Sequence, residues 1–193
     1  TTHARHHASS GDLDRRASNE GAIDTLTLAE YRALPPARRF VYRLYRHPLV
    51  LFGFGPSFLF FVQQRFPLGL TGKGWRPWAD ALGTTLGLAA VFGGLAWAFG
   101  WLPTLLIHGT SVALAATIGV WLFYVQHQFE HTVWARSADW KSSGAAFHGS
   151  SFYDLPAPLA WLTAYVGVHH VHHLSSRIPF YRLPDVLAAY PEL

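Results

Sequence analysis

Two uncharged stretches decide the fold: LGTTLGLAAVFGGLAWAF at residues 82–99 and LPTLLIHGTSVALAATIGVWLFYV at residues 102–125. A helix that crosses a bilayer needs ~20 predominantly apolar residues, and both stretches are of that length. Neither has the polar face that an amphipathic helix shows on a soluble bundle. Only Gly100 and Trp101 join them, so the two helices are expected to form a hairpin. We predict an all-α integral membrane protein organised around this transmembrane hairpin.

The composition agrees with a membrane protein, because 50% of the 193 residues are hydrophobic and only 13% are charged. The absence of Cys excludes disulfides and thiolate metal sites. All 15 Lys and Arg residues lie in residues 1–76 and 136–182. A basic-free middle argues against a nucleic-acid partner, and basic flanks place both ends of the hairpin on the cytoplasmic side. A bacterial inner membrane is the expected location.

Two histidine clusters with the same spacing, H-x-x-H-H, lie outside the hairpin. One cluster is at residues 3–7 and the other at residues 169–173. On a helix, positions i, i+3 and i+4 share one face, so each cluster presents three imidazoles together. Three neutral imidazoles form half of a transition-metal site. The alternatives are solvated polar helix ends or an N-terminal purification tag, but a tag would be a plain run of His without a copy near residue 170.

A shared metal centre requires both clusters on one side of the membrane, and therefore an even number of crossings between them. The hairpin supplies two, so the apolar stretches at 48–62 and 155–168 are expected not to span. The chain then divides into a cytosolic or interfacial part (1–78), a transmembrane hairpin (79–126) and a cytosolic histidine-rich helical cap (127–193).

A third pair of histidines follows the second apolar stretch, at positions 127 and 131, where helical i, i+4 spacing would point them the same way. Eight candidate metal ligands result: His3, His6, His7, His127, His131, His169, His172 and His173. One metal ion cannot use so many nitrogens, whereas two can. Nitrogen ligation suits Fe, Zn, Cu or Ni. Candidates for accepting the second ring N–H of a ligand, or otherwise supporting it, are His170, Asp12, Glu130 and Asp154.

Local signals predict two short helices before the hairpin. Thr27 and Glu30 have the spacing of a capping box, which starts a helix that must end before Pro35. Pro36 fits the first position of the next helix.

These motifs resemble those of the membrane fatty acid desaturase family. Residues 3–7 are similar to its second histidine box and residues 169–173 to its third, while residues 126–131 resemble the ligand region after its last membrane helix. Residues 149–156 (GSSFYDLP) and 174–184 (LSSRIPFYRLP) resemble bacterial acyl-lipid desaturases of the Δ12 type. The resemblance covers essentially the whole chain.

The resemblance implies an oxidoreductase that inserts a cis double bond into a long acyl chain. It implies two iron ions as cofactors, O₂ as co-substrate, and an acyl lipid or acyl thioester as substrate. The implied electron donor is a separate protein of the ferredoxin, rubredoxin or cytochrome b5 type. Related di-iron membrane hydroxylases and ketolases, acting on carotenoids or alkanes, share the histidine boxes and remain an alternative. A zinc-binding membrane protein without redox chemistry is a second alternative.

One feature of the family has no match in this sequence. The first histidine box, H-x-x-x-H, is absent, and the chain contains no Met. The expectation is an N-terminally incomplete single desaturase-type domain over residues 1–193, which alone binds metal poorly and is inactive.

Overall fold

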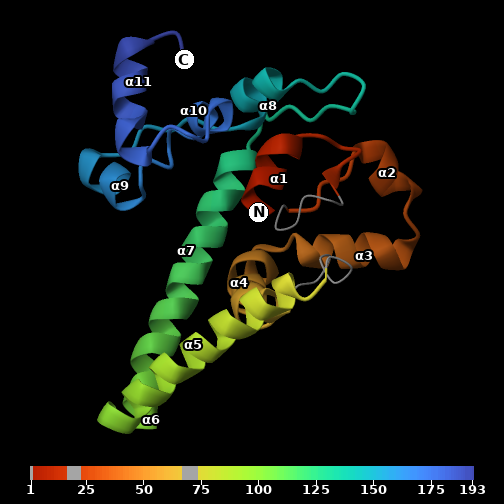
Figure 1. Ribbon diagram of the computed structural model, residues 1–193. Coiled ribbons are helices and arrows are strands. Elements are labelled where there is room, and N and C mark those ends of the chain that lie inside the picture. The colour runs from red at the N-terminus through yellow and green to blue at the C-terminus, as the bar shows by residue number, and fades with distance from the viewer. Residues whose placement is uncertain (1, 17–22, 67–73) are drawn as a thin grey trace. The chain divides into compact units, whose positions relative to one another are not determined.

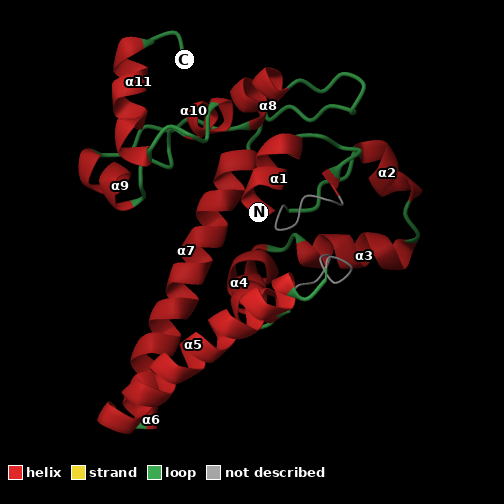
Figure 2. Ribbon diagram, viewed as in Figure 1, coloured by secondary structure: helices red, strands yellow, loops and turns green. Residues whose placement is uncertain are grey.

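The computed structural model describes residues 2–16, 23–66 and 74–193. Its regular elements within these ranges are all helical (Figure 2). The only β-type pairings described are two isolated bridges, Asp12 with Ala135 and Phe152 with Val168. The predicted all-α class is therefore confirmed.

The chain separates into two compact units. Unit 1 comprises Thr1–Ala33 and Leu122–Leu193, and unit 2 comprises Leu34–Trp121. The unit 1 helices are α1 (Thr2–Ser9), α2 (Leu28–Ala33), the end of α7 (Thr110–His127), α8 (Ser142–Gly149), α9 (Ala157–Leu162), α10 (His169–Leu174), η6 (Phe180–Arg182) and α11 (Leu183–Ala189). The unit 2 helices are α3 (Pro36–Tyr45), η2 (Leu49–Phe54), α4 (Gly55–Phe61), η3 (Gln63–Arg65), α5 (Arg76–Phe99), α6 (Trp101–Thr104), η5 (Leu105–Gly109) and the first part of α7.

The predicted hairpin is the main feature of unit 2. Helix α5 ends at Phe99. The next residue, Gly100, has a φ of 87°, a left-handed conformation that favours glycine, and the chain turns there into α6. The ring of Phe92 on α5 meets that of His108 on η5 at a centroid distance of 6.0 Å. Two helical segments, Arg76–Phe99 and Trp101–His127, are long and apolar enough to cross a membrane by length and composition. No residue of α5 is buried in the part of the chain that the structure describes.

Both short helices before the hairpin form as predicted. The Glu30 backbone N–H donates to Thr27 Oγ1 at 3.2 Å, and the Thr27 N–H donates to Glu30 Oε2 at 2.9 Å, which is a complete capping box. Pro36 occupies the first turn of α3. The 48–62 stretch folds as η2 and α4, two short helices of 6 and 7 residues.

Unit 1 carries the histidine clusters. Helix α1 lies beside the end of α7, and α10 packs on α8 (Figure 1). Three residues form a small apolar core: Val168, Val171 of α10 and Leu183 of α11. Between α9 and α10 the chain passes through two left-handed residues, Ala164 and Tyr165.

The expected helical pairing of His127 with His131 is wrong. Helix α7 ends at His127, and the residues that follow are irregular, so i, i+4 geometry does not apply to this pair.

Candidate metal centre

Helix α1 provides three histidines from two turns. Within this helix Ser9 Oγ donates to the Arg5 carbonyl at 2.9 Å. The helix stops because Gly11 adopts a φ of 75°, a left-handed conformation typical of the residue that ends a helix. His3 and His7, four residues apart, share a face, whereas His6 points to a different one.

Helix α10 provides three more histidines from six residues. Val171, which is 1% exposed, anchors the helix on the unit 1 core. The remaining positions of the helix are thus free to carry imidazoles on two other faces. His169 and His173 are four residues apart and meet through their Nε2 atoms at 3.1 Å, while His172 points elsewhere.

Four buried histidines converge on one point, and we refer to them as the buried group: His6, His127, His169 and His173. None of the four is more than 8% exposed. The Nε2 atom of His127 lies 3.0 Å from that of His6 and 3.0 Å from that of His169. The buried group therefore joins three segments that are far apart in the sequence.

Three further histidines form the outer group: His3, His7 and His172. The Nε2 atom of His7 lies 3.0 Å from that of His3 and 3.1 Å from that of His172, and the His3 and His172 Nε2 atoms are 3.5 Å apart. This group is more accessible than the buried group, with His3 exposed and the other two half-buried. The two groups are adjacent, because the rings of His7 and His173 stack at a centroid distance of 4.2 Å.

Each histidine helix contributes to both groups. The sequence suggested that the three imidazoles of a cluster act together on one face. Instead, neighbouring positions separate: His6 and His7 of α1 join different groups, as do His172 and His173 of α10. Successive residues of a helix point about 100° apart. One face of α1 and one face of α10 therefore contribute to the buried group, and a neighbouring face of each helix contributes to the outer group.

A hydrogen bond to a backbone carbonyl fixes the orientation of the His127 ring. Its Nδ1 lies 3.1 Å from the Gly149 carbonyl oxygen, which can only accept, so Nδ1 carries the proton. The Ser10 Oγ approaches the same nitrogen at 3.4 Å. The unprotonated Nε2 then faces the other imidazoles, which is the tautomer that a metal ligand requires.

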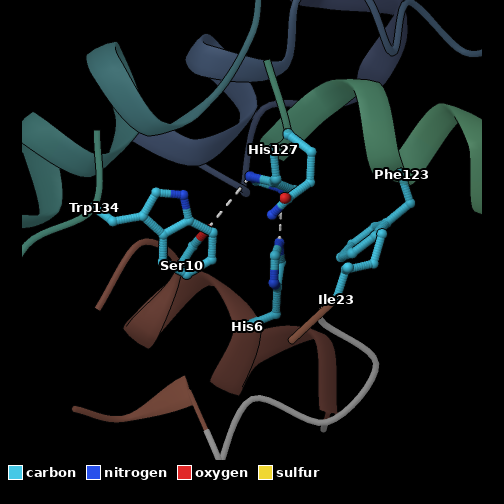
Figure 3. Close-up of a pocket in the computed structure, with 7 residues that line it drawn as sticks. His6, Ser10, Ile23, Phe123, His127 and Trp134 are labelled. Atoms are coloured by element: carbon cyan, nitrogen blue, oxygen red, sulfur yellow. Dashed lines mark hydrogen bonds between the residues drawn. The ribbon is translucent and has the colours of Figure 1, made fainter. Parts of the chain in front are cut away.

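A small cavity lies beside the buried group (Figure 3). Its volume of about 10 Å³ is room for about one water molecule. Figure 3 shows the rings of His6 and His127 facing each other, with Phe123 and Ile23 on one side and Trp134 on the other. The cavity is thus lined by the apolar side chains of Ile23, Phe123 and Trp134 and by four polar residues, His6, Ser10, His127 and Gln128.

The environment favours the uncharged form of several of these imidazoles. Burial is the main cause that lowers the pKa of His7 to about 4, and the neighbouring His172, His3 and His6 contribute to the same shift. Burial is also the main cause that lowers the pKa values of His169 and His173, helped by surrounding imidazoles. Neutral imidazole is the form that binds metal, so His7, His169 and His173 are in ligand form at neutral pH.

The geometry fits bound metal ions. Imidazole nitrogens about 2.1 Å from one ion and 90° apart lie about 3.0 Å from each other, which is the spacing seen in both groups. Hydrogen bonding alone cannot explain the outer group, because the Nε2 of a neutral imidazole is either a donor or an acceptor. Among three mutual Nε2 contacts, at least one therefore joins two donors or two acceptors. The all-nitrogen donor set suits a transition metal such as iron, copper or zinc.

Several sequence candidates lie outside both groups. His131 is exposed, as are Glu130 and Asp154. His170 is buried against the Phe152 ring at a centroid distance of 5.5 Å and does not join either group. Asp12 is buried, but its carboxylate contacts Arg15 and Ser137 and not a histidine, so it does not accept a ligand N–H.

Three contributors to the site were not found from the sequence. Gly149 acts through its carbonyl oxygen, which leaves no signal in the side-chain pattern. Ser10 lies three residues after His7, and the spacing of the histidine cluster does not point to it. Phe123, one turn before His127 on α7, packs on the rings of His6 and His127, and i, i+4 spacing could have indicated this.

The described residues combine two helices that are apolar enough to cross a membrane with adjacent groups of four and three convergent imidazoles, which are compatible with a metal site. The profile of the fatty acid desaturase family matches residues 1–193, and the chain belongs to that family.

Curated relatives agree with this assignment. The chain is 41% identical over 182 residues to a fatty acid desaturase of Bacillus subtilis (strain 168), covering 94% of this chain and 51% of that protein. It is 26% identical to the chloroplastic omega-6 fatty acid desaturases of Brassica napus and Glycine max, covering 94% of this chain and 40% and 41% of theirs. The chain thus spans about half the length of these relatives or less. No solved structure matches it.

Proposed function

We propose that the protein is a fatty acid desaturase that introduces a cis double bond into a long acyl chain. The observation that carries this proposal is the pair of adjacent histidine groups in a chain of the fatty acid desaturase family. In the overall reaction, two C–H bonds on neighbouring methylenes break and a C=C bond forms. One O₂ is reduced to two waters, with two electrons from an external donor and two protons from solvent.

Two iron ions are the proposed occupants, one in the buried group and one in the outer group. Bound iron would supply the activation of O₂ that removal of hydrogen from unactivated methylenes requires. The chain's own part is to hold neutral imidazoles at fixed distances. Gly149 keeps the His127 proton on Nδ1, and burial excludes water from the side of His169 and His173.

The proposed substrate is a long-chain acyl lipid or acyl thioester, and the proposed donor is a ferredoxin, rubredoxin or cytochrome b5 type protein. Support for a membrane setting comes from Arg76–Phe99 and Trp101–His127, which are apolar enough to span. The basic residues that flank the hairpin in sequence support a bacterial inner membrane with the histidines on the cytoplasmic side.

Product analysis tests the proposal. The full-length protein is expressed in a bacterial host, and total fatty acids are examined by mass spectrometry. We expect a product lighter by two hydrogens, which is absent with His127→Ala and present with His148→Ala, an exposed histidine outside both groups. A product that gains oxygen would instead indicate a hydroxylase or ketolase. Purified protein that holds zinc without iron would reject the redox function.

A further inference from the structure

Asp12 is the most completely buried charged residue that the structure describes, with an exposed fraction of 0%. A buried carboxylate is costly unless its oxygens are fully paired. Here Arg15 Nε donates at 2.6 Å, and Ser137 Oγ lies 2.8 and 2.9 Å from the two oxygens. The backbone N–H groups of Asp14 and Arg15 add bonds of 2.9 and 3.3 Å.

This carboxylate fastens the segment after α1 to the segment after α7. The two segments also pair through their backbones, because the Leu13 N–H donates to the Ala135 carbonyl at 2.9 Å and the Ala135 N–H donates to the Gly11 carbonyl at 2.9 Å. Trp140 Nε1 donates to the Ser10 carbonyl at 2.9 Å. Residues 10–13 are thus held from several sides, with Asp12 at the centre.

The nearby ion pairs of Arg136 are more exposed and contribute less to holding residues 10–13 in place. Arg136 bonds Asp14 at 2.6 Å and Glu30 at 3.0 Å, but its side chain is 48% exposed and that of Asp14 is 42% exposed. Ion pairs in contact with water contribute little net stability. The buried Asp12 is therefore the stronger anchor.

Helix α1 depends on this anchor for its position. The helix is only 8 residues long, and both of its alanines, Ala4 and Ala8, are exposed. Isolated helices of this length are not stable in water. Without an apolar residue to bury, α1 is held by its own imidazoles and by the chain that follows, where the Asp12 N–H bonds the Ser9 carbonyl at 3.1 Å.

We propose that Asp12 is a positioning residue for the metal centre, which holds α1 so that its three histidines meet those of α7 and α10. It touches no imidazole and acts through residues 9–11, including Ser10, whose Oγ reaches His127. The inference rests on the proposed metal centre. It differs from the sequence-based expectation that Asp12 would accept a ligand N–H.

The test combines two measurements on Asp12→Asn in the full protein. Asparagine keeps the shape and can still accept from Ser137, while Arg15, whose side chain is 44% exposed, can return to solvent. The control is Asp185→Asn, because Asp185 pairs with Arg182 over the same three-residue spacing on an exposed surface. Ser137→Ala removes only one partner and serves if Asp12→Asn fails to fold.

The first measurement is amide hydrogen exchange in the metal-free protein. We expect the amides of α1 to exchange at least about tenfold faster in Asp12→Asn, with α10 and α11 unchanged. The control should match the wild type. Unchanged protection of α1 in a folded Asp12→Asn protein would overturn the proposal.

The second measurement is titration with Co²⁺, followed by its visible absorption spectrum. Loss of a residue that orients ligands typically lowers metal affinity about 10–100-fold, and we expect that loss and an altered spectrum in Asp12→Asn. Wild-type affinity and spectrum in that variant would contradict the positioning role. If the wild type binds no metal while α1 still loosens in Asp12→Asn, the metal centre fails and the anchoring of α1 stands.

Discussion

His127 on α7 and Gly149 at the end of α8 are joined by a 3.1 Å hydrogen bond from the imidazole Nδ1 to the carbonyl oxygen. The bond leaves the Nε2 lone pair of His127 at the centre of the buried group, 3.0 Å from the Nε2 atoms of His6 and His169. A single backbone contact thus sets the tautomer of the histidine that connects α1 with α10.

His127→Ala should abolish metal binding by the buried group and leave metal binding by the outer group unchanged. His127 contributes to only one of the two groups, so the metal content should fall by about half, with a larger loss if the sites are coupled. Metal analysis of the purified protein measures this, with His148→Ala as the matched control. Full metal content in His127→Ala would show that the buried group is not a site.

His131→Ala distinguishes the structure from the sequence pattern. The helical spacing treated His127 and His131 alike, whereas the structure leaves His131 exposed and outside both groups. We therefore expect His131→Ala to keep its metal and its thermal stability. A loss as large as that in His127→Ala would mean that this side chain does reach a metal ion.

Acid should destabilise the metal-free protein. Burial, together with neighbouring imidazoles, lowers the pKa of His7 to about 4 from the value of 6.5 that applies to an unfolded chain. The same causes lower the pKa values of His169 and His173. Between pH 6.5 and about 4 the unfolded chain therefore binds more protons, and the free energy of unfolding falls as the pH falls. Above pH 6.5 both states are neutral, so these groups contribute no pH dependence.

Thermal unfolding at a series of pH values measures this effect. The melting temperature of the metal-free protein should be nearly constant from pH 8 to about 7 and should decrease towards pH 5. Saturating metal should raise it most at the higher pH, because protons compete for the same nitrogens. A melting temperature that rises between pH 7 and pH 5 would contradict the neutral, buried imidazoles.

Gly167 should not tolerate a side chain. A Cβ at this position would overlap the carbonyl group of Tyr153, and the obstacle is backbone that cannot swing aside. The Tyr153 N–H also donates to the Gly167 carbonyl at 3.1 Å, just before α10 begins. Gly167→Ala should therefore cost about 1–3 kcal/mol of stability and weaken metal binding by moving α10.

The control for that substitution is Gly144→Ala. A Cβ at Gly144 would meet only the Lys141 Cβ at 4.0 Å, an ordinary contact, and the position lies inside α8. Alanine in a helix interior is favoured over glycine by about 0.5–1 kcal/mol, so this variant should be at least as stable as the wild type. Equal stability of both variants would show that the Gly167 contact is not tight.

Short-range patterns made much of this structure predictable. The length of the two uncharged stretches predicted the α5–α7 hairpin. The spacing of Thr27 and Glu30 predicted a capping box, and the two H-x-x-H-H clusters predicted two helices that carry imidazoles. Each of these features depends on residues within a few turns of one another, which is the range over which periodicity carries information.

Features set by distant partners were not predictable. Adjacent histidines such as His6 and His7 enter different groups because residues more than 100 positions away, His127 and His172, lie on different sides of α1. Residues 128–143 contain no Gly or Pro to indicate that α7 ends at His127. The Gly149 carbonyl, being backbone, is invisible in a side-chain pattern.

The central claim is that the seven convergent histidines hold two iron ions. The most direct test is the metal content and Mössbauer spectrum of the full-length protein purified without added chelator from cells grown with ⁵⁷Fe. The account predicts two irons per chain in a nitrogen-rich environment. Protein that is correctly folded but contains zinc alone, or no metal after iron loading, would contradict it.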